Sequence, residues 1–202
     1  MPIKAVVFDA FGTLVRIHEG SHPYRQLIKL GMKQGRRPQP DDIRQIMTKP
    51  WDLAATAAGF GIQVDQEEMA QLQRKLDVEV ASIEAYEDGS KGIAIFRAAG
   101  FKVAVCSNLG KPYGAAVHRL FPGLDSYAFS FEVGAMKPEP AIYTSCCEAM
   151  GVAPGEVVMI GDSQRCDRDG PREVGIQGYY LDRFSGNGDF EDLERFARAI
   201  TA

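Results

Sequence analysis

Residues 5–14 read Ala-Val-Val-Phe-Asp-Ala-Phe-Gly-Thr-Leu, and this stretch decides the fold class of the chain. Its first four residues are apolar without alternation, which is the pattern of a strand buried on both faces of a parallel sheet. The run ends in Asp9, and Gly12-Thr13 then favour a turn. Ligands of open α/β sheets bind beyond the carboxyl ends of the strands. Asp9 is therefore a candidate functional residue.

Four more apolar runs of similar length follow along the chain, at residues 103–106, 127–131, 157–160 and 178–181. Helical patterns lie before and between them, at residues 91–99, 113–120, 141–150 and 169–174. An alternation of strands and helices predicts βαβ units, a parallel sheet and right-handed crossovers. We predict an α/β fold with a Rossmann-like parallel sheet.

Residues 15–85 do not follow this alternation, because they show helical spacing. Pro23 favours the first turn of one helix, and two further helices are expected at residues 41–47 and 51–58. Residues 65–68 resemble a capping box that opens a long helix, whose inward face carries Met69, Leu72, Leu76, Val80 and Ile83. We predict a core domain of residues 1–14 and 86–202, and a helical cap domain of residues 15–85 with hinges at its two ends.

The bulk composition excludes several classes of protein. A formal charge of −4 over 202 residues lacks the basic surface that binds nucleic acid, and Arg36-Arg37 is too short to supply one. No apolar run approaches the roughly 18 residues of a membrane span, and the first residues lead into a strand instead of a signal peptide. The four cysteines show no C-x-x-C spacing. We expect a cytoplasmic protein with a small-molecule substrate, and the oligomeric state is left open.

Polar groups follow or flank the predicted strands in a fixed order along the chain. Ser107-Asn108 follow the second strand, Lys137-Pro138 precede a helix, and Gly161-Asp162-Ser163 with Asp167 follow the fourth strand. Together with Asp9 they resemble the four motifs of the haloacid dehalogenase (HAD) superfamily. The resemblance covers the whole core, and the position of the insertion matches a C1 cap. It implies a hydrolase that uses Asp9 as a covalent nucleophile.

The resemblance also implies the role of each site residue. The catalytic residues would be Asp9 as nucleophile, Lys137 as a fixed cation, and Thr13 and Ser107 as hydroxyl donors. Substrate contacts are expected from Phe11, Gly12, Asn108 and His18. The metal would be Mg²⁺, bound by the carboxylates of Asp9, Asp162 and Asp167 and by the backbone carbonyl of Phe11, since clustered carboxylates repel one another without a cation.

The first motif departs from the usual phosphatase pattern. Phosphatases of the superfamily read D-x-D, and the second aspartate moves the proton of the leaving group; here Phe11 stands in its place, and a phenyl ring transfers no proton. The pattern is similar to the D-A-[FY]-G-T of 2-haloacid dehalogenases, whose halide needs no proton. Ser107-Asn108 and Tyr143 are similar to that subfamily too.

The fourth motif instead resembles that of the metal-dependent members of the superfamily. Dehalogenases are metal-free, whereas Gly161-Asp162-Ser163-x-x-x-Asp167 is similar to the Mg²⁺-binding form. The insertion also lacks the W-R motif of dehalogenase caps. A phosphonatase-like variant would need a cap lysine, for which Lys29, Lys33 and Lys49 are candidates only by location.

Three functions stay open from the sequence. The first is a Mg²⁺-dependent phosphohydrolase that acts on a small phosphorylated metabolite through an aspartyl-phosphate. The second is a metal-independent 2-haloacid dehalogenase, and the third is a HAD-fold protein that binds a ligand without turnover. His18 or Glu19 is the candidate for a substitute acid, because both lie in the segment that follows the first motif, whereas His22 is expected only to start a helix.

Overall fold

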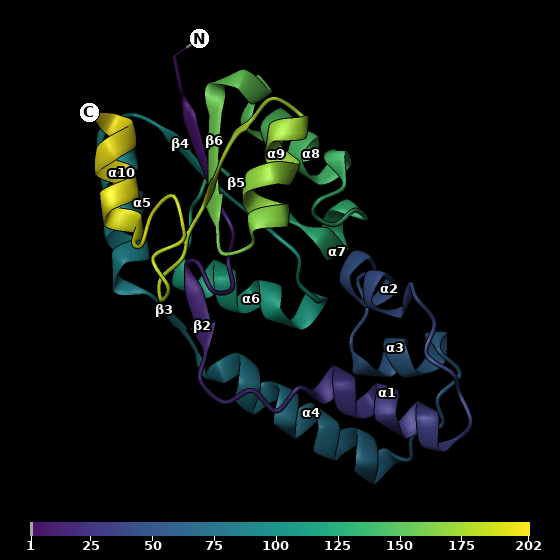
Figure 1. Cartoon of the computed structure of the whole chain (residues 1–202). Coiled ribbons are helices and arrows are strands. Elements are labelled where there is room, and N and C mark those ends of the chain that lie inside the picture. The colour runs from purple at the N-terminus through teal and green to yellow at the C-terminus, as the bar shows by residue number, and fades with distance from the viewer. Residues whose placement is uncertain (1) are drawn as a thin grey trace.

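The computed structural model describes residues 2–202 and contains a five-stranded parallel sheet (Figure 1). The strands run in the order β5 (Ser126–Phe129), β4 (Lys102–Ser107), β1 (Ala5–Phe8), β6 (Val157–Gly161) and β7 (Gln177–Tyr180). All four neighbouring pairs are parallel, so the carboxyl ends of the strands share one edge. The predicted α/β fold is confirmed.

Helices cover both faces of this sheet. One face packs against α5 (Glu87–Ala98), α6 (Lys111–Leu120) and α10 (Leu193–Thr201), and the other against α8 (Pro140–Met150) and α9 (Gly170–Glu173). Alternate residues of β1 point to opposite faces of the sheet. Val6 and Phe8 pack in the apolar cluster of the first face, and Ala5 and Val7 pack in that of the second. This two-residue period is that of a strand buried on both sides.

The third strand is shorter than predicted. It ends at Phe129, and the next residues form the short helix α7 (Ser130–Val133) instead of continuing to residue 131. The Ser130 hydroxyl accepts a bond from the Leu109 N–H and donates to the Leu109 carbonyl, which ties the chain to the loop after β4. A further helix, α10, was not predicted; it packs on α5 and contributes Phe196 to the core.

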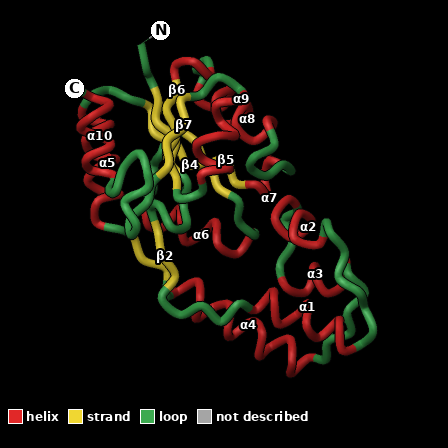
Figure 2. The backbone as a smooth tube through the Cα atoms, in the orientation of Figure 1, coloured by secondary structure: helices red, strands yellow, loops and turns green. Residues whose placement is uncertain are grey.

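The insertion contains four helices: α1 (Pro23–Lys33), α2 (Asp42–Thr48), α3 (Leu53–Gly59) and α4 (Gln66–Ala81). They lie beyond the carboxyl edge of the sheet, clear of its faces, and Figure 2 shows this separation plainly. Their own apolar cluster is built around Leu27, Leu53 and Leu76. The predicted cap of α4 forms, since the Asp65 carboxylate accepts the Glu68 N–H at 2.8 Å.

A two-stranded antiparallel ribbon joins the insertion to the core, and this corrects the all-helical prediction for residues 15–85. The ribbon pairs β2 (Val15–Ile17) with β3 (Ile83–Ala85), so Ile83 belongs to a strand and not to the face of α4. Three residues are too few to show an alternating pattern. Within residues 2–202 no helix has the length and apolarity that crossing a bilayer requires.

Candidate active site

Asp9 lies at the carboxyl end of β1, between the ends of β4 and β6, with 6% of its surface exposed. Its Oδ1 atom accepts hydrogen bonds from the Ser107 hydroxyl at 2.9 Å and from the Lys137 ammonium at 2.6 Å. The Thr13 hydroxyl approaches Oδ2 at 3.5 Å. The structure thus brings the four residues predicted as catalytic into one group.

Lys137 is 3% exposed and contacts a second carboxylate, the Oδ1 atom of Asp167, at 2.6 Å. Burial by itself lowers the pKa of this lysine, but the adjacent Asp167 and Asp9 outweigh it and hold the pKa well above its usual value. The amide of Asn108 fixes the lysine backbone, since it donates to the Lys137 carbonyl at 2.9 Å and accepts the Lys137 N–H at 2.7 Å. Asn108, predicted to touch substrate, therefore also positions the cation.

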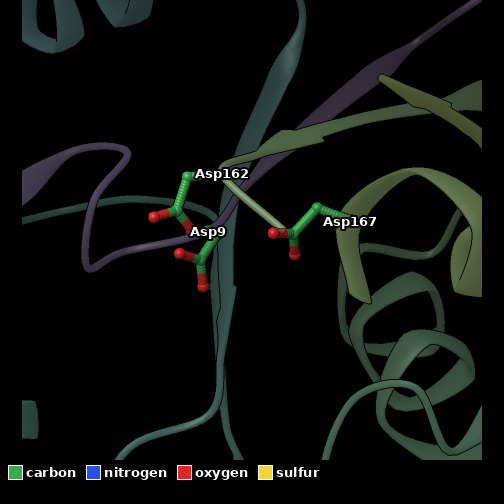
Figure 3. A group of neighbouring side chains, drawn as sticks. All are labelled: Asp9, Asp162 and Asp167. Atoms are coloured by element: carbon green, nitrogen blue, oxygen red, sulfur yellow. The ribbon is translucent and has the colours of Figure 1, made fainter. Parts of the chain in front are cut away.

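Three carboxylates gather at this edge, and Figure 3 shows them side by side. One oxygen each of Asp9, Asp162 and Asp167 lies within 4.8 Å of the others. Burial, followed by repulsion from Asp9 and Asp167, raises the pKa of Asp162 to about 7. Burial also raises the pKa of Asp167, although Lys137 opposes it. One ammonium leaves two of the three negative charges uncompensated, so an oxygen-ligated divalent cation fits this cluster.

Asp167 is held by more than the lysine. Its Oδ2 atom accepts the Ser163 N–H at 2.9 Å, and the π-helical segment that carries it, Gln164–Asp169, is fixed by a bond from the Tyr143 hydroxyl to the Cys166 carbonyl at 2.6 Å. Each Asp167 oxygen thus already accepts one hydrogen bond. Asp162 is the more accessible of the two fourth-motif carboxylates.

Gly12 makes room for Asp162. It has φ +81°, and a Cβ atom at this position would lie 1.9 Å from Asp162 Oδ2. The neighbouring Thr13 hydroxyl accepts the Asp162 N–H at 3.1 Å. The turn after β1 and the loop after β6 are therefore packed directly against each other, which explains why this turn needs glycine.

A cavity of about 590 Å³ opens between the insertion and the carboxyl edge of the sheet. Phe11 and Asn108, which follow Asp9 and Ser107 within two residues along the chain, line it from the core, and helices α1 and α2 line it from the insertion. The Phe11 ring also meets the ring of Tyr113 edge-on, at 5.9 Å between centroids. The predicted substrate contact of Phe11 is compatible with this placement.

The structure does not bring His18 to this cavity. Its Nε2 atom lies 2.7 Å from Glu84 Oε2, on the exposed side of the ribbon. His22 lines the cavity instead, although the sequence indicated only a helix start there. It stands at the N-cap of α1 with φ +52°, where its N–H donates to Glu79 at 2.6 Å. The turn between β2 and α1 decides which histidine points inward, and local sequence does not specify that turn.

Two residues near the site were missed by sequence reasoning. Arg183 donates to the carbonyl of Thr13 at 2.7 Å and to Asp88 at 2.8 Å, and so holds the turn after β1. Its place at the carboxyl end of β7 was a usable signal. Glu79 is 2% exposed and accepts the Tyr113 hydroxyl at 2.6 Å. It follows Leu72 by seven residues, so helical spacing placed it on the inward face.

The family model for haloacid dehalogenase-like hydrolases matches residues 3–175. The chain belongs to this family. It is a hydrolase of the HAD superfamily, and the match spans the first strand, the insertion and all four groups of site residues.

Individual relatives of this HAD hydrolase fall into two chemical groups. (S)-2-haloacid dehalogenase 4A of Burkholderia cepacia is 26% identical over 94% of this chain and 87% of its own length. A solved HAD phosphatase of Thermococcus onnurineus superposes with a TM-score of 0.66 at 23% identity, over 98% of both chains. A HAD-family enzyme of Bacteroides thetaiotaomicron, solved with magnesium and inorganic phosphate, gives 0.64 at 17% identity over 92% and 97% of the chains. Relatives alone leave the reaction open between the two groups.

Proposed function

We propose that this HAD hydrolase is a Mg²⁺-dependent phosphohydrolase of a small phosphorylated compound. The observation that carries the proposal is the cluster of Asp9, Asp162 and Asp167 around a single ammonium group. Its excess negative charge would oppose the approach of a phosphate dianion unless a cation is bound. The magnesium and phosphate complex of the Bacteroides enzyme is in line with this chemistry.

Asp9, Asp162 and the Phe11 carbonyl would hold the Mg²⁺, with Asp167 close by. A bound Mg²⁺ neutralises the carboxylates and polarises the phosphoryl oxygens. These residues fit Mg²⁺ because they offer oxygen ligands, and because the three carboxylates, the ammonium and the divalent cation together are nearly neutral.

The chain's own residues support a two-step displacement. An Asp9 carboxylate oxygen attacks phosphorus, a P–O bond to Asp9 forms, and the P–O bond to the leaving group breaks. Lys137, which stays protonated, and the Ser107 hydroxyl hold the carboxylate in place from Oδ1. In the second step water attacks phosphorus, its hydrogens stay with the phosphate product, and the Asp9 carboxylate is regenerated.

Phosphate release from a panel of esters, with Mg²⁺ and with EDTA, tests the proposal. We expect release that requires both the metal and Asp9, so that Asp9→Asn abolishes it while far-UV circular dichroism shows that the variant is folded. Metal-independent release, or release that survives Asp9→Asn, would contradict it.

A second candidate is a metal-independent 2-haloacid dehalogenase, and Phe11 is the observation that favours it. A halide departs as a stable anion, so the reaction does not need a proton donor at the position of Phe11. The full-length similarity to the Burkholderia dehalogenase agrees with this alternative. Chloride release from 2-chloropropionate in EDTA, absent in Asp9→Asn, would select it over the phosphohydrolase.

A further inference from the structure

We propose that the substrate is an aryl phosphate, a monoester of a phenol, whose ring occupies the cavity between the insertion and the carboxyl edge of the sheet. This inference rests on the proposed phosphohydrolase function and names its leaving group.

The wall of the cavity is largely apolar. Apolar side chains approach from both sides of the cavity: Phe11, Ile17, Ile28, Ile46, Met47 and Leu109. Tyr113 adds a second aromatic ring, edge-on to Phe11. About 590 Å³ accommodates a substituted ring, and an apolar wall with aromatic edges favours a flat apolar group over a hydrated one.

Three polar side chains of the inner wall, Asn108, Glu79 and Tyr24, already have partners within the protein, whereas the basic side chains of the wall lie on the exposed side of α1. Both ends of the Asn108 amide bond the backbone of Lys137. The Glu79 carboxylate accepts bonds from Tyr113, Ser21 and the His22 N–H. The Tyr24 hydroxyl donates to the Trp51 carbonyl. A sugar or polyol would bring several hydroxyls against this inner wall, where a hydroxyl without a partner weakens binding.

The supply of protons near Asp9 limits which leaving groups can depart. Phe11 lines the cavity two residues after Asp9 in the chain, and Lys137 is engaged by two carboxylates. An alkanol would leave as an alkoxide, whose conjugate acid is as weak as water with a pKa of about 15.7, whereas a phenol has a pKa of about 10. In the first step the Asp9–phosphorus bond forms and the phosphorus–phenol oxygen bond breaks. A phenolate leaves with the electron pair, and no proton is required.

Basic side chains at the rim suit a phosphate dianion. His22, Arg25 and Lys29 line the cavity from the start and exposed side of α1. Within residues 2–202 the side chains of Arg25 and Lys29 form no ion pair with a carboxylate. Arg25 and Lys29 give the entrance a positive field that draws the substrate in and does not discriminate between leaving groups.

The test compares three esters in the presence of Mg²⁺. Phenyl phosphate and cyclohexyl phosphate are matched in size and apolarity and differ in the acidity of the alcohol, while a hexose 6-phosphate differs also in polarity. We expect kcat/KM for phenyl phosphate to exceed that for cyclohexyl phosphate by about 10²-fold or more, which is the usual contribution of a general acid. Among ring-substituted phenyl phosphates kcat/KM should fall as the pKa of the phenol rises.

Two variants separate the leaving-group argument from the cavity argument. Phe11→Asp places a carboxyl group beside Asp9, and we expect it to narrow the gap between cyclohexyl and phenyl phosphate. Met47→Gln makes a half-buried part of the wall polar, and we expect KM for phenyl phosphate to rise by about tenfold while inhibition by inorganic phosphate is unchanged.

The outcomes are distinguishable. If the hexose phosphate or cyclohexyl phosphate is hydrolysed as well as phenyl phosphate, the aryl phosphate inference is wrong while the phosphohydrolase function stands. If no ester releases phosphate in a metal- and Asp9-dependent way, both fail together.

Discussion

A single ammonium group organises the charges of the site at the residue scale. Lys137 is almost fully buried and touches both Asp9 and Asp167 at 2.6 Å. Taking such a group out of water is costly, and the two carboxylates recover that cost only while the contacts are intact. The lysine is therefore expected to stabilise the fold in addition to its proposed role in catalysis.

Lys137→Met should destabilise the protein by about 3–5 kcal/mol, because two buried carboxylates lose their counterion. The double variant Lys137→Met/Asp167→Asn should recover part of this loss. Urea unfolding followed by circular dichroism measures both. Lys33→Met, at an exposed position on α1, is the control and should change the free energy of unfolding by less than about 0.5 kcal/mol. An equal effect at both lysines would contradict the prediction.

Asp162 should make the metal-free protein less stable as the pH rises. Burial and the neighbouring Asp9 and Asp167 raise its folded-state pKa from 3.8 to about 7, so the folded state binds more protons than the unfolded state between these values. Stability then falls as the pH increases through this window. In EDTA, the unfolding free energy of the wild type relative to Asp162→Asn should decrease from pH 5 to pH 8. A difference that is constant or increases would refute the assignment.

The turn between β1 and β2 is the element on which the site depends. It is packed against Asp162 through Gly12, and its carbonyls are held by Arg183, whose guanidinium lies 4.1 Å from the centre of the Tyr86 ring. Strand β1 supplies Asp9, the proposed nucleophile, but loops after β6 and β7 set the shape of the turn. Positioning is thus shared among elements far apart in the sequence.

Gly12→Ala should abolish activity and weaken Mg²⁺ binding, because the new methyl group would meet Asp162 Oδ2 at 1.9 Å. Gly35→Ala is the matched control, since Gly35 also has positive φ but nothing lies within 4 Å of its Cβ position. Both variants should lose about 1–2 kcal/mol from the left-handed backbone. Titration calorimetry with Mg²⁺ and phosphate release are the measurements, and equal activity of the two variants would oppose this account.

At the scale of the whole molecule, the insertion contacts the core on two sides of the cavity. The Glu79 to Tyr113 bond joins α4 to α6, and Arg44 of α2 forms a two-point ion pair with Glu139, next to Lys137-Pro138, at 3.0 Å. The ribbon of β2 and β3 lies at residues 15–17 and 83–85, where the sequence predicted hinges. Closure of the cavity therefore depends on contacts away from the ribbon.

Glu139→Arg should raise KM, because it places two arginines opposite each other where the insertion meets the core. The swapped pair Arg44→Glu/Glu139→Arg should restore KM toward the wild-type value. Stability should change by less than about 1 kcal/mol, since both partners are solvent-exposed. Steady-state kinetics measures KM, and urea unfolding measures stability. A failure of the swap to restore KM would mean that this pair does not close the cavity.

Much of the fold was accessible to sequence reasoning because burial on both faces leaves uninterrupted apolar runs, as at residues 5–8 and 157–160. The ribbon and α7 were missed. Each is only three or four residues long, and its structure comes from a partner segment far away, such as Leu109 for Ser130. Short elements carry too little periodicity to be recognised alone.

The sequence by itself determined the parallel sheet, the insertion and the polar residues at the strand ends. Apolar periodicity and the alternation of strands with helices can be read locally, and a parallel sheet places the carboxyl ends of its strands at one edge. Tertiary structure alone decided that His22 and not His18 lines the cavity, that Arg183 holds the turn after β1, and that Glu79 bonds Tyr113. These outcomes depend on how elements distant in the chain pack against one another, and no local pattern encodes that packing.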